Sequence, residues 1–66
     1  MNFETIATNE VLLKVNRDEL IILNNALNEI CNGGLLAIEE FSTRMGATRQ
    51  ETNHILEQIS SILDQM

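Results

Sequence analysis

The sequence predicts a mainly α-helical chain: an N-terminal β-hairpin or strand packed on three helices that are long, short and long. Three observations lead to this class. Apolar residues alternate with a period of two over residues 3–15, and they recur with helical spacing in later segments. Glycines at 33, 34 and 46 divide the rest of the chain into three stretches, and no proline interrupts them. With 66 residues, the chain forms a single domain, residues 1–66.

The first element is a hairpin over residues 3–15, because apolar and polar residues alternate there. A loop over residues 8–10 would place Phe3 opposite Val15, Thr5 opposite Leu13, Ala7 opposite Val11 and Glu4 opposite Lys14. The last of these is a favourable pair of opposite charges. A two-residue loop would set Glu4 against Leu13, so we expect the longer loop. A lone hairpin is marginal in water, so it needs helices beneath it or a partner's strands beside it.

The first long helix spans residues 17–32. Asn16 is a good N-cap, and Glu19 stands three residues later, where its carboxylate can complete a capping box. Gly33 and Gly34 end the helix, and we expect one of them to be left-handed. At 100° per residue, the apolar side covers about half of the circumference. Its members are Leu20, Ile22, Leu23, Ala26, Leu27, Ile30 and Cys31.

The opposite side of this helix is rich in asparagine. Asn24, Asn25 and Asn28 surround Ile21, with Asn32 nearby and Glu29 at the edge. Exposed helix faces normally carry Glu, Lys, Arg or Gln, which are better helix formers than Asn. The face is therefore either a contact patch for a partner or a merely solvated surface, and the sequence leaves both interpretations open.

A short helix over residues 37–45 stops at Gly46, and a capping box of Thr48 and Glu51 opens the last helix. The apolar stripe of that helix consists of Thr52, Ile55, Leu56, Ile59, Ile62, Leu63 and Met66. We expect one shared core, which is centred on Leu23, Leu27, Ile30, Phe41, Ile55 and Ile59. Cys31 is most simply a small buried apolar residue.

The charge balance restricts the classes of function. The chain has 4 basic and 10 acidic residues, a formal charge of -6, which is the wrong sign for binding phosphates but suits docking on a basic protein. The single cysteine excludes an internal disulfide, and with one histidine the chain is too poor in ligands for a zinc site. We expect no metal, no cofactor, no signal peptide and no membrane span, and hence a cytoplasmic protein. So small a core also favours a homodimer.

Enzymatic chemistry is not expected. His54 has Glu51 three residues before it, but carboxylate–imidazole pairs at this spacing are common on helices. Glu39 and Glu40 are adjacent and therefore point in different directions, so they do not form a pair that shares a proton. No nucleophile stands beside a base that is oriented by a third group.

Residues 38–59 resemble a helix-turn-helix motif. Phe41 and Met45 are apolar, the small Ser42 would face the second helix, and Gly46 lies in the turn. The second helix would then present Arg49, Gln50, Asn53 and His54, which are residue types that contact bases or phosphates. Ser42 and Thr52 depart from the alanine and the valine or isoleucine of that motif.

Charge argues against DNA binding by this segment. Residues 35–66 contain five acids but only Arg44 and Arg49 as bases, whereas a DNA-binding domain shows a basic footprint. We therefore interpret the segment as helix-turn-helix packing that serves another purpose, and we keep a DNA-binding regulator as an alternative.

A second resemblance covers residues 20–33 and 38–47, whose patterns LNNALNEICNG and IEEF-x-TRMGA are similar to those of small acidic bacterial immunity proteins. The resemblance implies an inhibitor that binds and neutralises a cognate toxin, often a nuclease. The other alternative is a dimerisation module. The expected partner-binding residues are exposed acids and amides of the helices together with one isoleucine: Ile21, Asn24, Asn25, Asn28, Glu29, Glu39, Glu40, Glu57 and Asp64.

Overall fold

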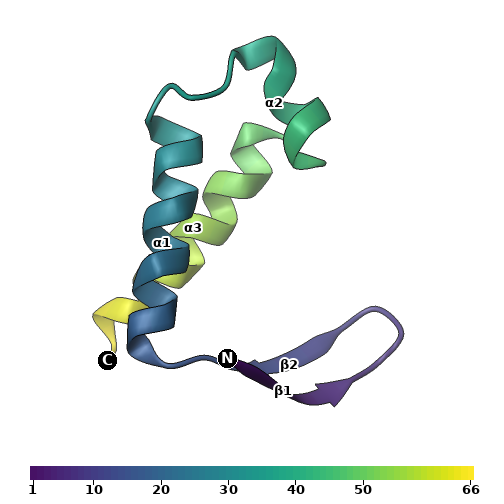
Figure 1. Cartoon of the computed structure of the whole chain (residues 1–66), viewed down its shortest axis with the longest axis vertical. Coiled ribbons are helices and arrows are strands. Elements are labelled where there is room, and N and C mark those ends of the chain that lie inside the picture. The colour runs from purple at the N-terminus through teal and green to yellow at the C-terminus, as the bar shows by residue number, and fades with distance from the viewer.

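The computed structural model describes residues 1–66 and shows a two-stranded antiparallel hairpin followed by three helices (Figure 1). The elements are β1 (Asn2–Ile6), β2 (Val11–Lys14), α1 (Arg17–Asn32), α2 (Ile38–Met45) and α3 (Arg49–Asp64). The predicted fold class, mainly α with an N-terminal hairpin and long, short and long helices, is confirmed. None of the helices has both the length and the apolar character that crossing a membrane requires.

The helix ends form as their sequences predict. Asn16 accepts a hydrogen bond from the Glu19 N–H (2.8 Å), and the Glu19 carboxylate accepts one from the Asn16 N–H (3.1 Å). Thr48 and Glu51 make the same reciprocal pair at the start of α3, both at 3.0 Å. Gly46 ends α2 in the left-handed conformation at φ 71°, which costs glycine little because it has no Cβ.

The buried core lies where α1 ends and α3 begins, and α2 covers that end of the helix pair (Figure 1). We call this region the closed end and define it by its buried residues: Cys31, Phe41, Thr52 and Leu56. Leu27, Ile30, Leu36 and Met45 pack around it. The Thr52 hydroxyl donates to the Thr48 carbonyl (2.9 Å), so this buried polar group is satisfied.

Part of the predicted core is wrong. Phe41 is buried and Leu27, Ile30 and Ile59 are half-buried, as expected, but Leu23 and Ile55 are exposed. The cause is that the apolar arc of α1 spans about half of the helix, whereas a single neighbouring helix covers a narrower stripe. The stripe that meets α3 contains Asn24 and leaves the side with Leu23 uncovered.

The hairpin is confirmed, but its predicted register is wrong. The pairs are Asn2 with Lys14, Phe3 with Leu13, Thr5 with Leu12 and Ile6 with Val11. The Ala7 N–H donates to the Glu10 carbonyl (2.7 Å), so the chain turns tightly at residues 8–9 rather than through a longer loop. A bulge at Glu4 then removes that carboxylate from the position opposite Leu13 and brings Phe3 there instead.

The hairpin stands off the helices. Figure 1 shows it extending sideways from the start of α1, and every residue of both strands is exposed. Its link to the helices is the amino group of Met1, which pairs with the Glu19 carboxylate at the first turn of α1. The expected packing of the hairpin on the helices is therefore limited to its first residues.

Candidate partner-binding surface

The helix pair has two different sides. α1 and α3 run antiparallel (Figure 1), with Cys31 beside Arg49 and Asn24 beside Ser60. On each helix, the residues that contact the other helix form a stripe, and every other position has an angle from that stripe at 100° per residue. Because the two helices are antiparallel, positions with a positive angle from the stripe lie on the same side of the pair in both helices. That side carries polar and acidic residues from both helices, with Arg17 and Ile21 on its α1 border. We call it the acid-amide face, and its members are Asn25, Asn28, Asn53, Glu57 and Asp64.

The predicted acidic residues are all exposed, but they do not form one cluster. Glu57 and Asp64 share the acid-amide face, seven residues apart on α3. Glu29 lies on the outer side of α1, away from α3, and Glu39 with Glu40 occupies the first turn of α2. The one ion pair of the whole chain joins the Met1 amino group to Glu19, so the other nine carboxylates have no cationic partner.

Two carboxyl groups in the first turns of helices have a lowered pKa because hydrogen bonds stabilise their charged forms. The pKa of Glu19 is lowered first by its hydrogen bond with the Met1 amino group and then by the Asn16 N–H. The pKa of Glu51 is lowered chiefly by the N–H of Thr48. Both carboxylates therefore have structural partners and are not free to serve as partner-binding groups.

Two members of the predicted asparagine patch are half-buried rather than exposed. Ile21 and Asn24 are half-buried, and Asn24 Oδ1 accepts a hydrogen bond from the Ser60 hydroxyl of α3 (2.7 Å). The expectation that both are fully exposed is wrong, and for Asn24 the reason is that an amide is tolerated between helices when a hydroxyl satisfies it. Asn25 and Asn28 are exposed as expected, and Asn28 accepts from the Asn32 side chain (2.9 Å).

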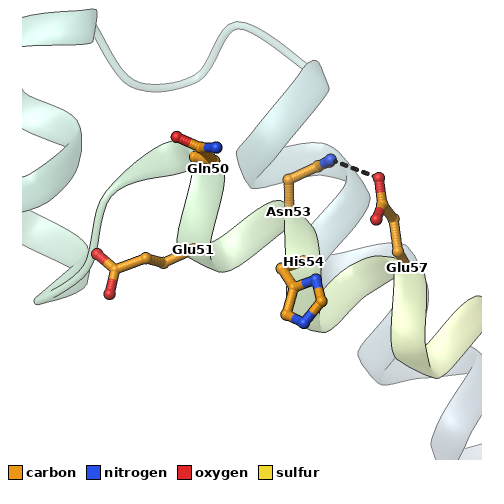
Figure 2. A pocket seen from close by; sticks show the side chains of 5 residues that line it. All are labelled: Gln50, Glu51, Asn53, His54 and Glu57. Atoms are coloured by element: carbon orange, nitrogen blue, oxygen red, sulfur yellow. Dashed lines mark hydrogen bonds between the residues drawn. The ribbon is translucent and has the colours of Figure 1, made fainter.

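A shallow polar hollow lies along the first turns of α3, lined by Gln50, Glu51, Asn53, His54 and Glu57 (Figure 2). Figure 2 shows these side chains spreading apart rather than converging on one point. Asn53 donates to Glu57 (3.2 Å), and His54 makes no hydrogen bond with Glu51, whose carboxylate instead meets the Thr48 N–H. No three His, Cys, Asp or Glu side chains lie close enough together to hold a metal ion.

Arg49 has a structural role that the sequence analysis missed. Its guanidinium donates to the Cys31 carbonyl and to the Leu36 carbonyl (3.4 Å), and it lies over the Phe41 ring, 4.7 Å from the centroid. The available signal was its position: a cation at the first residue of a helix opposes the helix dipole and therefore indicates a compensating partner. Of the arginines in the helix-turn-helix-like segment, only Arg44 remains exposed.

Comparison of the chain with protein-family models, with curated proteins and with solved structures gives no match in any of the three.

Proposed function

We propose that this chain is an immunity-type inhibitor, a protein without catalytic activity that binds and neutralises a basic toxin, in particular a nuclease. The observation that carries the proposal is the uncompensated charge: nine of the ten carboxylates have no cationic partner within the chain. Of the four basic side chains, Arg49 is committed to the closed end. The exposed surface is therefore more acidic than the composition alone indicates.

The acid-amide face is the proposed docking surface. Its carboxylates, Glu57 and Asp64, lie on one side of one helix, and the amides of Asn25 and Asn28 stand beside them on α1. Carboxylates at such spacing present a nuclease with a negative surface in place of its phosphate substrate. Complementary fields speed the encounter, and the amides supply hydrogen bonds once water is excluded. Glu29, Glu39 and Glu40 lie off this face and add to the long-range field.

A DNA-binding regulator is the second candidate, because the α2–turn–α3 segment has the connection of a helix-turn-helix, with left-handed Gly46 in the turn. The charges at the start of α3, which would be the recognition helix, oppose DNA binding. Glu51 and Glu57 flank Gln50 and His54, and Arg49 is engaged by two carbonyl groups. A phosphate backbone would therefore meet carboxylates where it needs cations. These contacts favour a protein partner.

The test is co-expression with the protein encoded next to this chain, followed by measurement of affinity and association rate as salt is raised. We expect tight binding with an association rate that falls with salt. Glu57→Lys should slow association roughly tenfold, whereas Glu10→Lys makes the same charge change in the hairpin turn, away from the docking face, and should have a smaller effect.

Two outcomes would reject the proposal. One is an affinity that is indifferent to salt, with charge reversals at Glu29, Glu39, Glu40, Glu57 and Asp64 all harmless. The other is tight, salt-sensitive binding to a specific DNA duplex, which would establish the regulator instead.

A further inference from the structure

One edge of β2 has hydrogen-bonding groups without a strand to meet them. The sheet has only two strands, so one edge of β2 pairs with β1 and the other is open. Every residue of the strand is exposed, and the hairpin extends away from the helices (Figure 1). The Ala7 N–H donates to the Glu10 carbonyl, so the even-numbered residues of this strand direct their main-chain groups to β1. The N–H and C=O groups of Val11 and Leu13 therefore point to the open edge.

The side chains of the hairpin separate into two different faces. Directly paired residues share a face, and neighbours along a regular strand alternate between faces. The pairs Phe3 with Leu13 and Ile6 with Val11 therefore lie on the same face, because the bulge at Glu4 shifts the alternation of β1. All four are apolar and between 48% and 65% exposed. An apolar face on two strands is marginal in water and becomes stable with three or more strands.

A second copy of β2 fits the open edge in one register. An antiparallel two-fold pairing centred on Leu12 sets Val11 opposite Leu13 of the second copy, so the outward main-chain groups meet each other. The same register sets Glu10 opposite Lys14 of the second copy, and the two-fold axis repeats this pair. Opposite charges at directly opposed positions stabilise a sheet. The edge is therefore complementary to itself in both hydrogen bonding and charge.

The neighbouring registers lack this complementarity. Hydrogen bonding also allows a two-fold axis at Val11 or at Leu13, because the main-chain groups of both residues point outward. An axis at Val11 would set Glu10 against Leu12, and an axis at Leu13 would set Lys14 against Leu12. Both leave a charge opposite an aliphatic side chain. The charges of the strand therefore select the register that is centred on Leu12.

The outer edge of β1 is less suited to the same contact. The bulge at Glu4 interrupts its regular ladder, and Glu4 is also the only charged side chain of the strand, so it has no base to pair with in a second copy. The hairpin as a whole is the least acidic part of the chain. Residues 1–16 contain two acids and one base, a formal charge of -1 out of the total of -6. Two acidic chains therefore repel each other least at this end.

We infer that two copies of the chain join through their β2 edges, forming a four-stranded antiparallel sheet in the order β1-β2-β2-β1. The apolar faces of the two hairpins become one continuous face that carries the side chains of Phe3, Ile6, Val11 and Leu13 from each copy. No residue of the acid-amide face takes part. The inference is therefore independent of the proposed function.

A charge exchange tests the inference in the full chain. Sedimentation equilibrium of the native chain should approach twice the 7.4 kDa chain mass as concentration rises through the micromolar range. Glu10→Lys and Lys14→Glu should each raise the dimer dissociation constant about tenfold, because each variant sets like charges opposite one another twice. The double variant restores opposite charges and should restore the dimer. Glu4→Lys makes the same charge change in β1 and should leave the dissociation constant unchanged.

Mixing the two single variants gives the sharpest result. Lysines at positions 10 and 14 of one variant then face glutamates at positions 14 and 10 of the other, so a mixed dimer should form although each variant alone stays monomeric. Helical circular dichroism should be the same for all variants, because the hairpin stands off the helices. A monomer mass for the native chain at every concentration would overturn the inference. So would a double variant or a mixture that fails to recover the dimer.

The main-chain contact has its own test. Hydrogen exchange of the Val11 and Leu13 amides should slow as protein concentration rises, whereas the Leu12 amide, which faces β1, should change less. Leu13→Pro removes one N–H from the open edge without removing a hydrogen bond to β1, and it should abolish the dimer. A dimer that withstands this substitution, or whose Val11 and Leu13 amides exchange freely, would place the contact elsewhere and reject the inference.

Discussion

The chain has two phenylalanines, one in the closed end and one in the hairpin, and their surroundings show how these two regions differ. Phe41, in the closed end, is 2% exposed and has Cys31 and Leu56 in the same buried cluster, with the Arg49 guanidinium over its ring. Phe3, in the hairpin, is 62% exposed although its strand pairs correctly with Leu13. Hydrogen bonding alone therefore builds the hairpin, whereas the closed end is built by side chains from three helices. A regular element is not yet a core, because burial needs a further layer.

Alanine at each phenylalanine should give the largest contrast between the two regions. Phe41→Ala should cost about 3–5 kcal/mol of unfolding free energy, because it empties the centre of a small core. Phe3→Ala, at an exposed position, should cost under about 1 kcal/mol. Urea unfolding at one fixed protein concentration would measure both. Equal losses would mean that the hairpin is as well packed in solution as the closed end.

The arginines sharpen the same contrast. Arg49→Ala removes the donor to the Cys31 and Leu36 carbonyls and the cation over Phe41, so we expect a loss of about 1–3 kcal/mol. Arg49→Lys keeps the charge but lacks the planar fork that reaches two carbonyls, and it should recover only part of the loss. Arg44→Ala, on the exposed side of α2, should cost no more than about 0.5–1 kcal/mol. If the lysine variant is fully stable, charge alone explains Arg49.

The helix caps should behave alike in the two regions. Asn16 caps α1 next to the hairpin, and Thr48 caps α3 at the closed end, with the same reciprocal bonds. Either residue changed to alanine should cost about 1 kcal/mol, measured by thermal unfolding. Asn25→Ala, on an exposed position within α1, serves as the control and should be neutral or slightly stabilising. A much larger effect at Thr48 would show that its cap is coupled to the buried core.

The smallest expected effect is on the pH dependence of the free energy of unfolding in acid. The pKa values of Glu19 and Glu51 in the folded chain lie below their ordinary value of 4.5, so the folded state binds fewer protons than the unfolded state in that range. The stability that the hydrogen bonds of these two carboxylates contribute, with the Met1 amino group and Asn16 for Glu19 and with Thr48 for Glu51, is therefore present above pH 4.5 and is lost as the pH falls below it. Glu51→Gln, which does not titrate, should lose less stability than the native chain between about pH 7 and pH 3. Identical pH profiles would contradict this assignment.

Local signals predicted the elements and their ends. The capping boxes at Asn16 and Thr48 and the stop at Gly46 involve residues within a few positions of one another, so their chemistry is visible in the sequence. The hairpin register was harder to predict, because the preference for a tight turn opposes the preference to keep Glu4 away from Leu13. The tight turn at residues 8–9 prevails, and the bulge at Glu4 relieves the unfavourable pair with Leu13 that had favoured a longer loop.

The packing of α1 could not be read from its pattern. An apolar arc half a turn wide does not indicate which part meets α3, and the Asn24 partner, Ser60, is 36 residues away. Ile21 and Asn24 are therefore half-buried where exposure was expected, while Asn25, Asn28, Glu57 and Asp64 are exposed as expected. The predicted partner-binding residues therefore fall into two groups. The carboxylates are exposed because burying a charge is costly, so their exposure is predictable from residue type. The exposure of an asparagine depends instead on which side of α1 contacts α3, and only tertiary contacts decide that.

The bulge at Glu4 has a consequence for solubility. Both strands of the hairpin are edges, and a flat apolar edge invites the addition of further strands and, in the end, fibrils. The extra residue at Glu4 breaks the regular ladder of β1, and Lys14 places a charge at the end of β2. Irregular, charged edges are the means by which β-proteins resist growth into aggregates. Deleting Glu4 to make the strand regular would therefore make this chain more prone to fibril formation.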